Sequence, residues 1–223
     1  VLVDYSVKVK AGELTIIRTD SHLSQPLVKE IYKQVLLKGA YPVVRMGVEG
    51  LNEVYIKNAT DEQLEYIDPM TELEYEKAQN LISIGAPLNV KNMARFDSKK
   101  LAKRSSVMKH LSEKMLQRAA NGELNWVIAD FPTNALAQEA NMSLEDYTEF
   151  LIKSCYLHEE NPVQKWIEID NEQKRIADIL NKTSKIRFVG DKTDITFSTE
   201  NRTWIPCSGN MNFPDGEIFT SPV

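Results

Sequence analysis

The sequence predicts an α/β fold with a mostly parallel sheet flanked by helices, followed by the start of a β-rich second domain. Up to residue 183, short apolar runs alternate with longer amphipathic segments, a pattern typical of parallel strands joined by helices. After residue 184 the hydrophobic period changes to two, which indicates hairpins. We therefore expect an α/β N-terminal domain over residues 1–183 and the truncated beginning of a β-rich domain over residues 184–223.

Four apolar runs predict the strands of the sheet. They are residues 13–18 (ELTIIR), 41–46 (YPVVRM), 81–86 (LISIGA) and 125–130 (NWVIAD). The segment 47–59 is expected to be a loop with a short strand at residues 53–56. The opening residues, VLVDYSV, read like the end of a helix, so we expect the chain to be trimmed at its start and to be a fragment.

Capping residues predict where the helices begin and end. A polar residue that can accept a backbone N–H, often followed by proline, is typical of a helix start, and glycine is typical of a helix stop. Thr60 and Ser143 also begin capping-box patterns. On these grounds we expect helices after Ser24, Thr60, Asp68, Asp97, Thr133, Ser143 and Asn161, with stops at Gly39 and at Asn121-Gly122.

The last forty residues alternate apolar and polar side chains. Ile186 and Phe188 precede a Gly190-Asp191 turn, and Ile195 and Phe197 follow it, which predicts a hairpin. Residues 203–206 and 217–220 are expected to form further strands. Hairpins of this size bury little surface, so we expect this unit to pack on the α/β domain or to belong to a larger one.

Charge and composition exclude several classes of protein. The chain has 32 acidic and 27 basic residues and a formal net charge of -5, so no overall positive field would attract nucleic acid. No apolar run is long enough to span a membrane. The two cysteines are too few for a disulfide framework or an all-thiolate zinc site. These features favour a cytoplasmic protein without nucleic-acid or membrane partners.

Common nucleotide, zinc-protease and serine-hydrolase motifs are absent from the sequence. Cys155 and His158 lie one helical turn apart, which could form half of a metal site, although a buried thiol beside a surface imidazole is the more frequent arrangement. Asp130 stands at the carboxyl end of a predicted parallel strand, where ligands bind in open α/β sheets. A structural turn or cap role is the alternative for Asp130.

Two further groups have both a functional and a structural interpretation. Lys99, Lys100, Lys103 and Arg104 could hold an anion at the start of a helix, or they could simply form its solvated face. Trp126 and Trp166 are expected to pack in the core rather than to stack on a substrate.

The segment around Glu217 carries the clearest chemistry. Pro214-Asp215-Gly216 predicts a tight turn, and Glu217 follows it at the start of an apolar strand. A carboxylate in that position has a fixed direction and could bind a divalent cation. One carboxylate is not a metal site, so an ordinary hairpin glutamate remains the alternative.

Four segments of the sequence resemble those of a known family. The run NMNFPDGEIFTSPV, together with TDITFS, PTNALAQEANMSLEDY and the opening LVDYSVKVKAGE, is similar to the thermophilic aminopeptidases of the aminopeptidase T, aminopeptidase S and PepS group. The resemblance implies a two-metal exopeptidase that acts on peptides with a free N-terminus. It also implies an N-terminal α/β domain, a C-terminal catalytic domain and a homodimer.

In that family the glutamate of the P-D-G-E turn is the first metal ligand, and it matches Glu217. The resemblance implies that the other ligands and the catalytic residues come from later sequence, so we expect this polypeptide alone to bind metal weakly and to be inactive. It does not distinguish Zn, Co, Mn or Mg. Two alternatives stay open: a non-enzymatic α/β ligand-binding or interaction module, and a nucleotide-binding α/β domain.

Overall fold

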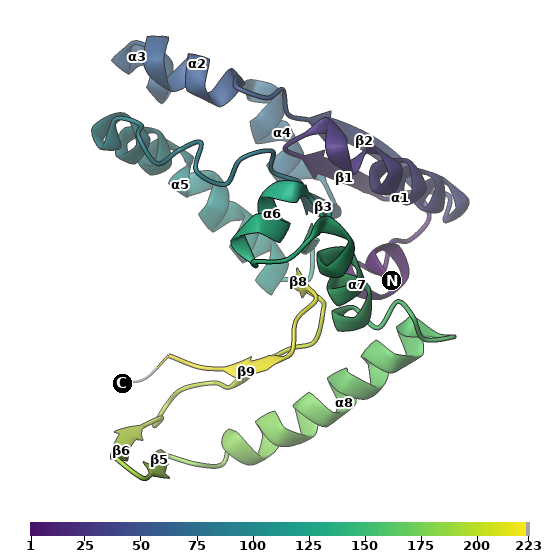
Figure 1. Ribbon diagram of the computed structural model, residues 1–223, viewed down its shortest axis with the longest axis vertical. Coiled ribbons are helices and arrows are strands. Elements are labelled where there is room, and N and C mark those ends of the chain that lie inside the picture. The colour runs from purple at the N-terminus through teal and green to yellow at the C-terminus, as the bar shows by residue number, and fades with distance from the viewer. Residues whose placement is uncertain (222–223) are drawn as a thin grey trace.

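A five-stranded sheet with the order β2-β1-β3-β4-β8 forms the centre of the computed structural model, which describes residues 1–221 (Figure 1). All neighbouring strands in it are parallel. The strands are β1 (Leu14–Thr19), β2 (Tyr41–Met46), β3 (Asn80–Gly85), β4 (Asn125–Asp130) and β8 (Asn212–Phe213). The predicted fold class is confirmed, and the four strands expected from the apolar runs are those of the sheet up to residue 183.

Alternate residues of the central strands pack into two different hydrophobic cores, one on each face of the sheet. Ile17, Ile82 and Val127 are aligned across β1, β3 and β4 and lie in the larger buried cluster. Their neighbours Ile16 and Leu81 point to the opposite face, into a smaller cluster. Because successive side chains of a strand point to opposite faces, each face needs its own cover of helices.

Ten helical segments connect and cover the strands in residues 1–221. They are η1 (Leu2–Ser6), η2 (His22–Ser24), α1 (Gln25–Leu37), α2 (Leu51–Asn58), α3 (Asp61–Glu65), α4 (Pro69–Lys77), α5 (Ser98–Ala120), α6 (Asn134–Glu139), α7 (Leu144–Ser154) and α8 (Pro162–Leu180). The expected side-chain caps are present at Thr60, Asp68, Asp97, Thr133, Ser143 and Asn161.

Two local predictions are wrong. The segment expected to be a loop with a strand at residues 53–56 is helix α2, whose Ile56 packs against Ala59 and Leu64 in a small separate core. Ser24 occupies the N-cap position of α1, but its side chain caps no backbone group of that helix. Its hydroxyl instead lies 2.6 Å from the hydroxyl of Thr19 at the end of β1.

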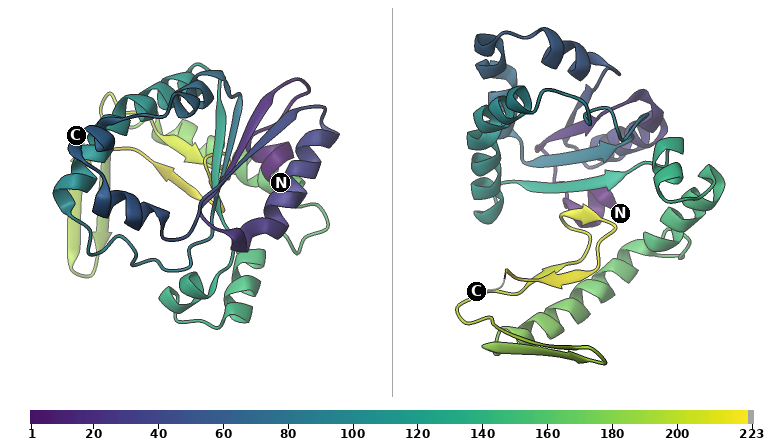
Figure 2. Two further views of the ribbon diagram at one scale, coloured as in Figure 1. Left: turned by 90° about the horizontal axis from the view of Figure 1, so that it is seen from above. Right: turned by 60° about the vertical axis from the view of Figure 1, so that its left-hand side comes forward.

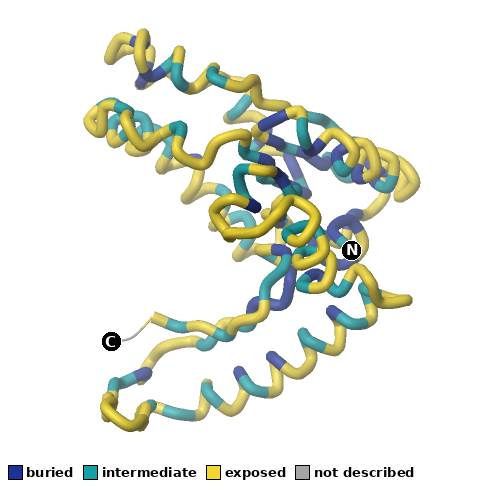
Figure 3. The backbone as a smooth tube through the Cα atoms, viewed as in Figure 1, coloured by how far each residue is buried: buried dark blue, intermediate teal, exposed yellow. Residues whose placement is uncertain are grey.

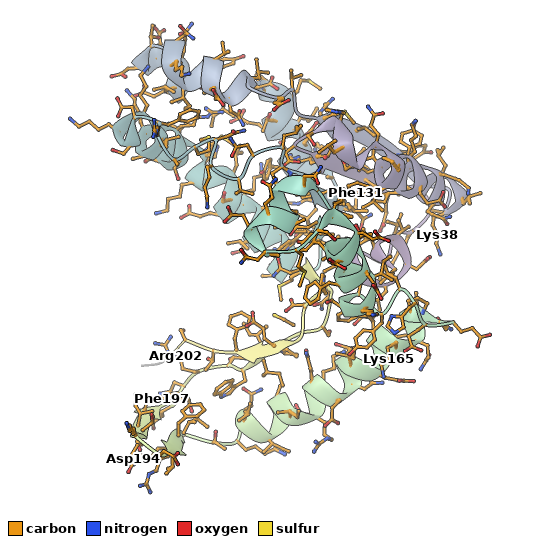
Figure 4. All side chains as sticks on the ribbon, in the orientation of Figure 1. Lys38, Phe131, Lys165, Asp194, Phe197 and Arg202 are labelled. Carbon is orange, nitrogen blue, oxygen red and sulfur yellow. The ribbon has the colours of Figure 1, made fainter. Side chains whose placement is uncertain are left out.

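The chain leaves the sheet after α7 and later returns to it. Helix α8 runs away from the sheet and carries the antiparallel hairpin of β5 (Lys185–Gly190) and β6 (Thr193–Ser198) at its far end (Figure 2). Phe197 and Asp194 of this hairpin lie far from Phe131 (Figure 4), and most of the hairpin is exposed (Figure 3). The predicted hairpin is confirmed.

The returning segment contains both further strands that the sequence predicts. β7 (Ile205–Cys207) pairs antiparallel with β9 (Glu217–Phe219), and β8 lies between them in the sequence but joins β4 in the main sheet. The division into units at residue 184 stays a prediction. Residues from both sides of it contribute strands to the same sheet. The final two residues of the run NMNFPDGEIFTSPV lie outside the described part of the chain.

Among the described residues, no helix has the length and apolar character that a membrane span requires.

Candidate metal centre

Glu217 stands at the first position of β9, directly opposite Cys207 in the β7–β9 ladder. Side chains of directly opposed residues in an antiparallel pair emerge on the same face. Asp215 precedes Glu217 by two residues, and the backbone bends at Pro214 without forming the hydrogen-bonded turn expected over residues 214–216. The pairing of β7 with β9, together with the bend at Pro214, brings three potential ligands close together.

These three side chains form a compact cluster. One ligand atom from each of Cys207, Asp215 and Glu217 lies within 4.8 Å of the other two, and within residues 1–221 they are the one such group of three. Cys207 is 2% exposed, Asp215 is half-buried and Glu217 is exposed. The cluster is thus buried at Cys207 and exposed to solvent at Glu217.

The two oxygens of the Asp215 carboxylate have different surroundings. Oδ1 accepts a hydrogen bond from the backbone N–H of Gly216 at 2.8 Å. Oδ2 is buried and has no hydrogen-bond partner among the described residues. A buried carboxylate oxygen without a donor is energetically costly unless a cation or another partner satisfies it. The residues present therefore fit a divalent cation, for which carboxylate oxygens and thiolate sulfur are ordinary ligands.

Cys207 lies beside two acidic side chains. Burial raises the pKa of its thiol to about 11, and the negative charges of Asp215 and Glu217 and a hydrogen bond to the Asp215 carboxylate act in the same direction. A thiol beside two carboxylates keeps its proton in the absence of a cation.

Buried contacts hold the segment between β7 and β8 in place. Ser208 is fully buried, and its hydroxyl donates to Asp170 of α8 at 2.7 Å. Gly209 adopts a positive φ of 86° and passes so close to Trp166 that a Cβ there would lie 3.0 Å from the indole ring. Phe213 in β8 packs on the same indole, with ring centroids 5.1 Å apart. The predicted core role of Trp166 is confirmed, since this side chain is fully buried.

The side chains of Cys155 and His158 have different surroundings. Cys155 is buried beneath Trp166, whose indole N–H donates to the Cys155 carbonyl at 3.0 Å. His158 lies near the surface, with Nε2 3.5 Å from a carboxylate oxygen of Glu159. The structural interpretation, a buried thiol beside a surface imidazole, describes both residues.

The basic residues at the start of α5 contact neighbouring helices instead of an anion. Lys100 donates to the carbonyl oxygens of Ile56, Lys57 and Ala59 at 2.9, 3.3 and 2.9 Å, at the end of α2. Such contacts satisfy carbonyls that a helix end leaves without partners.

The next two basic residues of this run bind α3 and the residue after it. Arg104 donates to the carbonyls of Leu64 and Tyr66, and Lys103 pairs with Asp61 and Glu65. Neither an anion site nor a purely solvated face describes this arrangement.

Asp130 packs at the carboxyl edge of the sheet as the strand prediction placed it. A Cβ at Gly85 of β3 would lie 2.3 Å from its Oδ1, so the neighbouring strand makes room for this carboxylate. Burial of part of the side chain, and then the charge of Asp20, raise the pKa of Asp130 above its ordinary value.

Cys207 and Asp215 were not identified as candidate ligands from the sequence. A partial signal existed, because residues 203–206 and 217–220 were both predicted as strands, and pairing them brings Cys207 opposite Glu217. The register of that pairing could not be read from local patterns alone.

Known proteins are similar to this chain in sequence and in fold. The sequence matches the family described as thermophilic metalloprotease (M29) over residues 1–223. The fold is similar to that of wild-type AmpT from Thermus thermophilus, with a TM-score of 0.77 and 18% sequence identity. The match covers 99% of this chain and 59% of that one, and at this identity it shows a shared fold. No curated protein matches the sequence.

Proposed function

The chain belongs to the thermophilic metalloprotease family (M29), and on that basis we propose that it forms part of a two-metal aminopeptidase that removes N-terminal residues from peptides. The observation that carries the proposal is the place of Glu217. Its carboxylate stands at the start of β9, belongs to the cluster with Asp215 and Cys207, and is exposed to solvent, where a substrate could approach.

In this proposal the chain itself positions the ligands on one side of the site. The β7–β9 pairing and the segment around Ser208 fix the direction of Glu217, and Asp215 stands behind it in a half-buried position. A pair of bound divalent cations would supply an activated water, a polarised scissile carbonyl and a binding point for the free amino group. A ligand held on rigid backbone keeps such a site in its working geometry without reorganisation.

The proposal assigns the rest of the site to sequence beyond residue 223. The chain spans 59% of the length of the solved AmpT structure it matches. We propose that a C-terminal catalytic domain provides the remaining ligands and catalytic residues, and that the enzyme is a cytoplasmic homodimer. The metal stays among Zn, Co, Mn and Mg. The chain of residues 1–223 is expected to be inactive by itself.

The test combines metal analysis with a peptidase assay. The full-length gene product should hydrolyse an aminoacyl-nitroanilide in a chelator-sensitive way, and Glu217→Ala should lose both bound metal and activity. Glu200→Ala removes an exposed carboxylate from the nearby β6–β7 connection and should change neither. An unaffected Glu217→Ala enzyme would contradict the assignment. Chelator-sensitive activity of residues 1–223 at a rate comparable to the full-length protein would contradict the expected inactivity.

A further inference from the structure

We propose that one face of the β5–β6 hairpin is the surface of this chain on which the C-terminal domain of the same polypeptide docks. The face is apolar, and the core of that domain covers it. The inference rests on the proposed function only in one respect, namely that a domain follows residue 223. It does not depend on any metal ligand.

The register of the hairpin creates this apolar face. Ile186 lies opposite Phe197, and Phe188 lies opposite Ile195. Because opposed residues emerge on the same face and every second residue of a strand shares a face, these four side chains form one continuous surface. The rings of Phe188 and Phe197 stack within it, with centroids 5.7 Å apart.

The other face of the hairpin is mostly polar. Arg187 donates two hydrogen bonds to the carboxylate of Asp194, both at 2.7 Å. The remaining side chains of β5 and β6 on that face are Lys185, Val189, Thr196 and Ser198. Charged groups are costly to remove from water, so the apolar face is the one suited to burial.

The apolar face is largely open to solvent within residues 1–221. Phe188 and Ile195 are each 54% exposed, and none of the three hydrophobic clusters formed by the described residues includes a residue of the hairpin. A two-stranded hairpin is marginally stable by itself in water. Contiguous exposed apolar side chains of this kind mark an interaction surface.

The base of the hairpin is fixed to the end of α8. Thr199 is 1% exposed and donates from its backbone N–H to the carbonyl of Ser184 at 3.0 Å. Its hydroxyl donates to the carbonyl of Thr183 at 3.3 Å. The hairpin therefore leaves α8 in a defined direction, and a partner meets a surface that is already formed.

The size of the face favours a tethered domain over a second copy of the chain. Four partly exposed side chains offer on the order of 300 Å², since a large aromatic side chain buries about 150–250 Å². Two copies stacked through this face would bury about 600 Å², whereas a specific interface between separate proteins buries about 1,200–2,000 Å². A domain on the same polypeptide needs less area, because the tether keeps its effective concentration high.

The comparison and the figures agree with this occupant. The chain spans 59% of the solved AmpT chain, so a relative of that length has room for a further domain. Figure 1 shows β9, the last strand of the described chain, on the same side of the main sheet as the hairpin. A domain that follows β9 would begin close to the face it covers.

Hydrogen exchange of the full-length gene product and of residues 1–223 tests the proposal. Exchange in residues 185–198 should be at least about tenfold slower in the full-length protein, because opening the hairpin there also breaks its contact with the domain. Exchange in β1 and β3 should agree between the two proteins and serves as the reference. Equal exchange of the hairpin in both proteins would overturn the proposal.

Two neighbouring substitutions test the face itself. Phe188→Asp places a charge on the apolar face, and Val189→Asp places the same charge on the opposite face, at a residue that is 70% exposed. In the full-length protein Phe188→Asp should restore the fast exchange of the hairpin and lower the Tm by several degrees, and Val189→Asp should do neither. In residues 1–223 neither variant should change the Tm. Equal effects of the two variants, or an equal loss from Phe188→Asp in both proteins, would contradict docking on this face.

A milder variant and a mass measurement complete the test. Ile195→Thr should shift exchange and Tm of the full-length protein in the same direction by less, which keeps the test valid if Phe188→Asp fails to fold. By sedimentation, Ile195→Thr should leave the mass of the full-length protein and of residues 1–223 unchanged. Dissociation of a dimer by this variant would assign the face to a second copy and overturn the proposal.

The results also separate this inference from the proposed function. If the full-length protein is a chelator-sensitive peptidase but its hairpin exchanges as in residues 1–223, the docking surface is wrong and the function stands. If the hairpin is protected as expected but the full-length protein has no peptidase activity, the surface stands and the proposed function is wrong.

Discussion

The hydroxyl of Tyr5 donates a hydrogen bond to the carbonyl oxygen of Ser208 at 2.7 Å, although 203 positions separate the two residues in the sequence. Both side chains are buried, and Ser208 directly follows Cys207 of the metal cluster. The opening helix η1 therefore supports the segment that carries a candidate ligand, through a contact that crosses almost the whole chain.

Replacing Tyr5 by phenylalanine should destabilise the protein. The Ser208 carbonyl would lose its buried donor, and a buried group left without its partner costs about 1–3 kcal/mol. We expect urea denaturation of Tyr5→Phe to show a loss of this size in the free energy of unfolding. Tyr41→Phe is the matched control, because Tyr41 is 64% exposed. Equal stability of the two variants would show that the Tyr5 bond contributes nothing.

Replacing Lys100 by methionine should loosen helix α2 without unfolding the sheet. Methionine keeps much of the length of the side chain but cannot donate to the three carbonyls at the end of α2. Hydrogen exchange should become faster in residues 51–58 and stay unchanged in β1 and β3. Lys99→Met changes the exposed neighbouring residue and should leave exchange in α2 as it is. A uniform rise in exchange over the whole chain would contradict the local role of Lys100.

The stability of the protein should depend on pH through Asp130. Its folded-state pKa is raised from 3.8 by burial and by Asp20, so the favourable contribution of this group is complete below its ordinary pKa and is lost as the pH rises through the raised value. Asp130→Asn should therefore be more stable than the original protein at neutral pH, with the difference vanishing below pH 3.8.

The matched control for this pH dependence is Asp191→Asn, at an exposed turn position. Its free energy of unfolding should follow that of the original protein across the pH range. Denaturation of all three proteins in urea at several pH values gives the comparison. A difference between Asp130→Asn and the original protein that grows toward low pH would reverse the sign argued above.

Cys155 should react slowly with alkylating reagents in the folded protein. Burial raises the pKa of its thiol from 9.0 to about 11, and only the thiolate is nucleophilic. At a pH near 8 the thiolate fraction is then about one hundredth of that of an ordinary cysteine. Mass spectrometry after timed iodoacetamide treatment should show at least this reduction in rate against urea-unfolded chain. Similar rates in both states would mean that the thiol is accessible and normally acidic.

The parts of the fold that depend on neighbouring residues could be predicted from the sequence. Thr60, Asp68 and Asn161 cap their helices because each side-chain oxygen reaches a backbone N–H only two or three positions ahead. The apolar run at residues 125–130 coincides with β4. This strand could be predicted because a short apolar run is itself a local signal for a buried strand.

The parts that depend on distant contacts could not. The segment of α2 contains Val54, Tyr55 and Ile56, which favour strands, and burial of Ile56 against Leu64 decides for the helix instead. Likewise, nothing local indicates that Asn212 and Phe213 return to pair with β4. Glu217 was found as a candidate because its motif is local, whereas Cys207 lies beside it only through the register of two strands.

The return of β8 to the sheet has a practical consequence for anyone who divides this protein. A recombinant piece that stops at residue 183 would lack the outermost strand of its own sheet, leaving one side of β4 open to pairing with foreign chains. It would also lack Phe213 and Gly209, which pack against the indole of Trp166. Such a piece should be prone to aggregation, so a soluble version of the α/β half would have to keep the chain at least through Phe213.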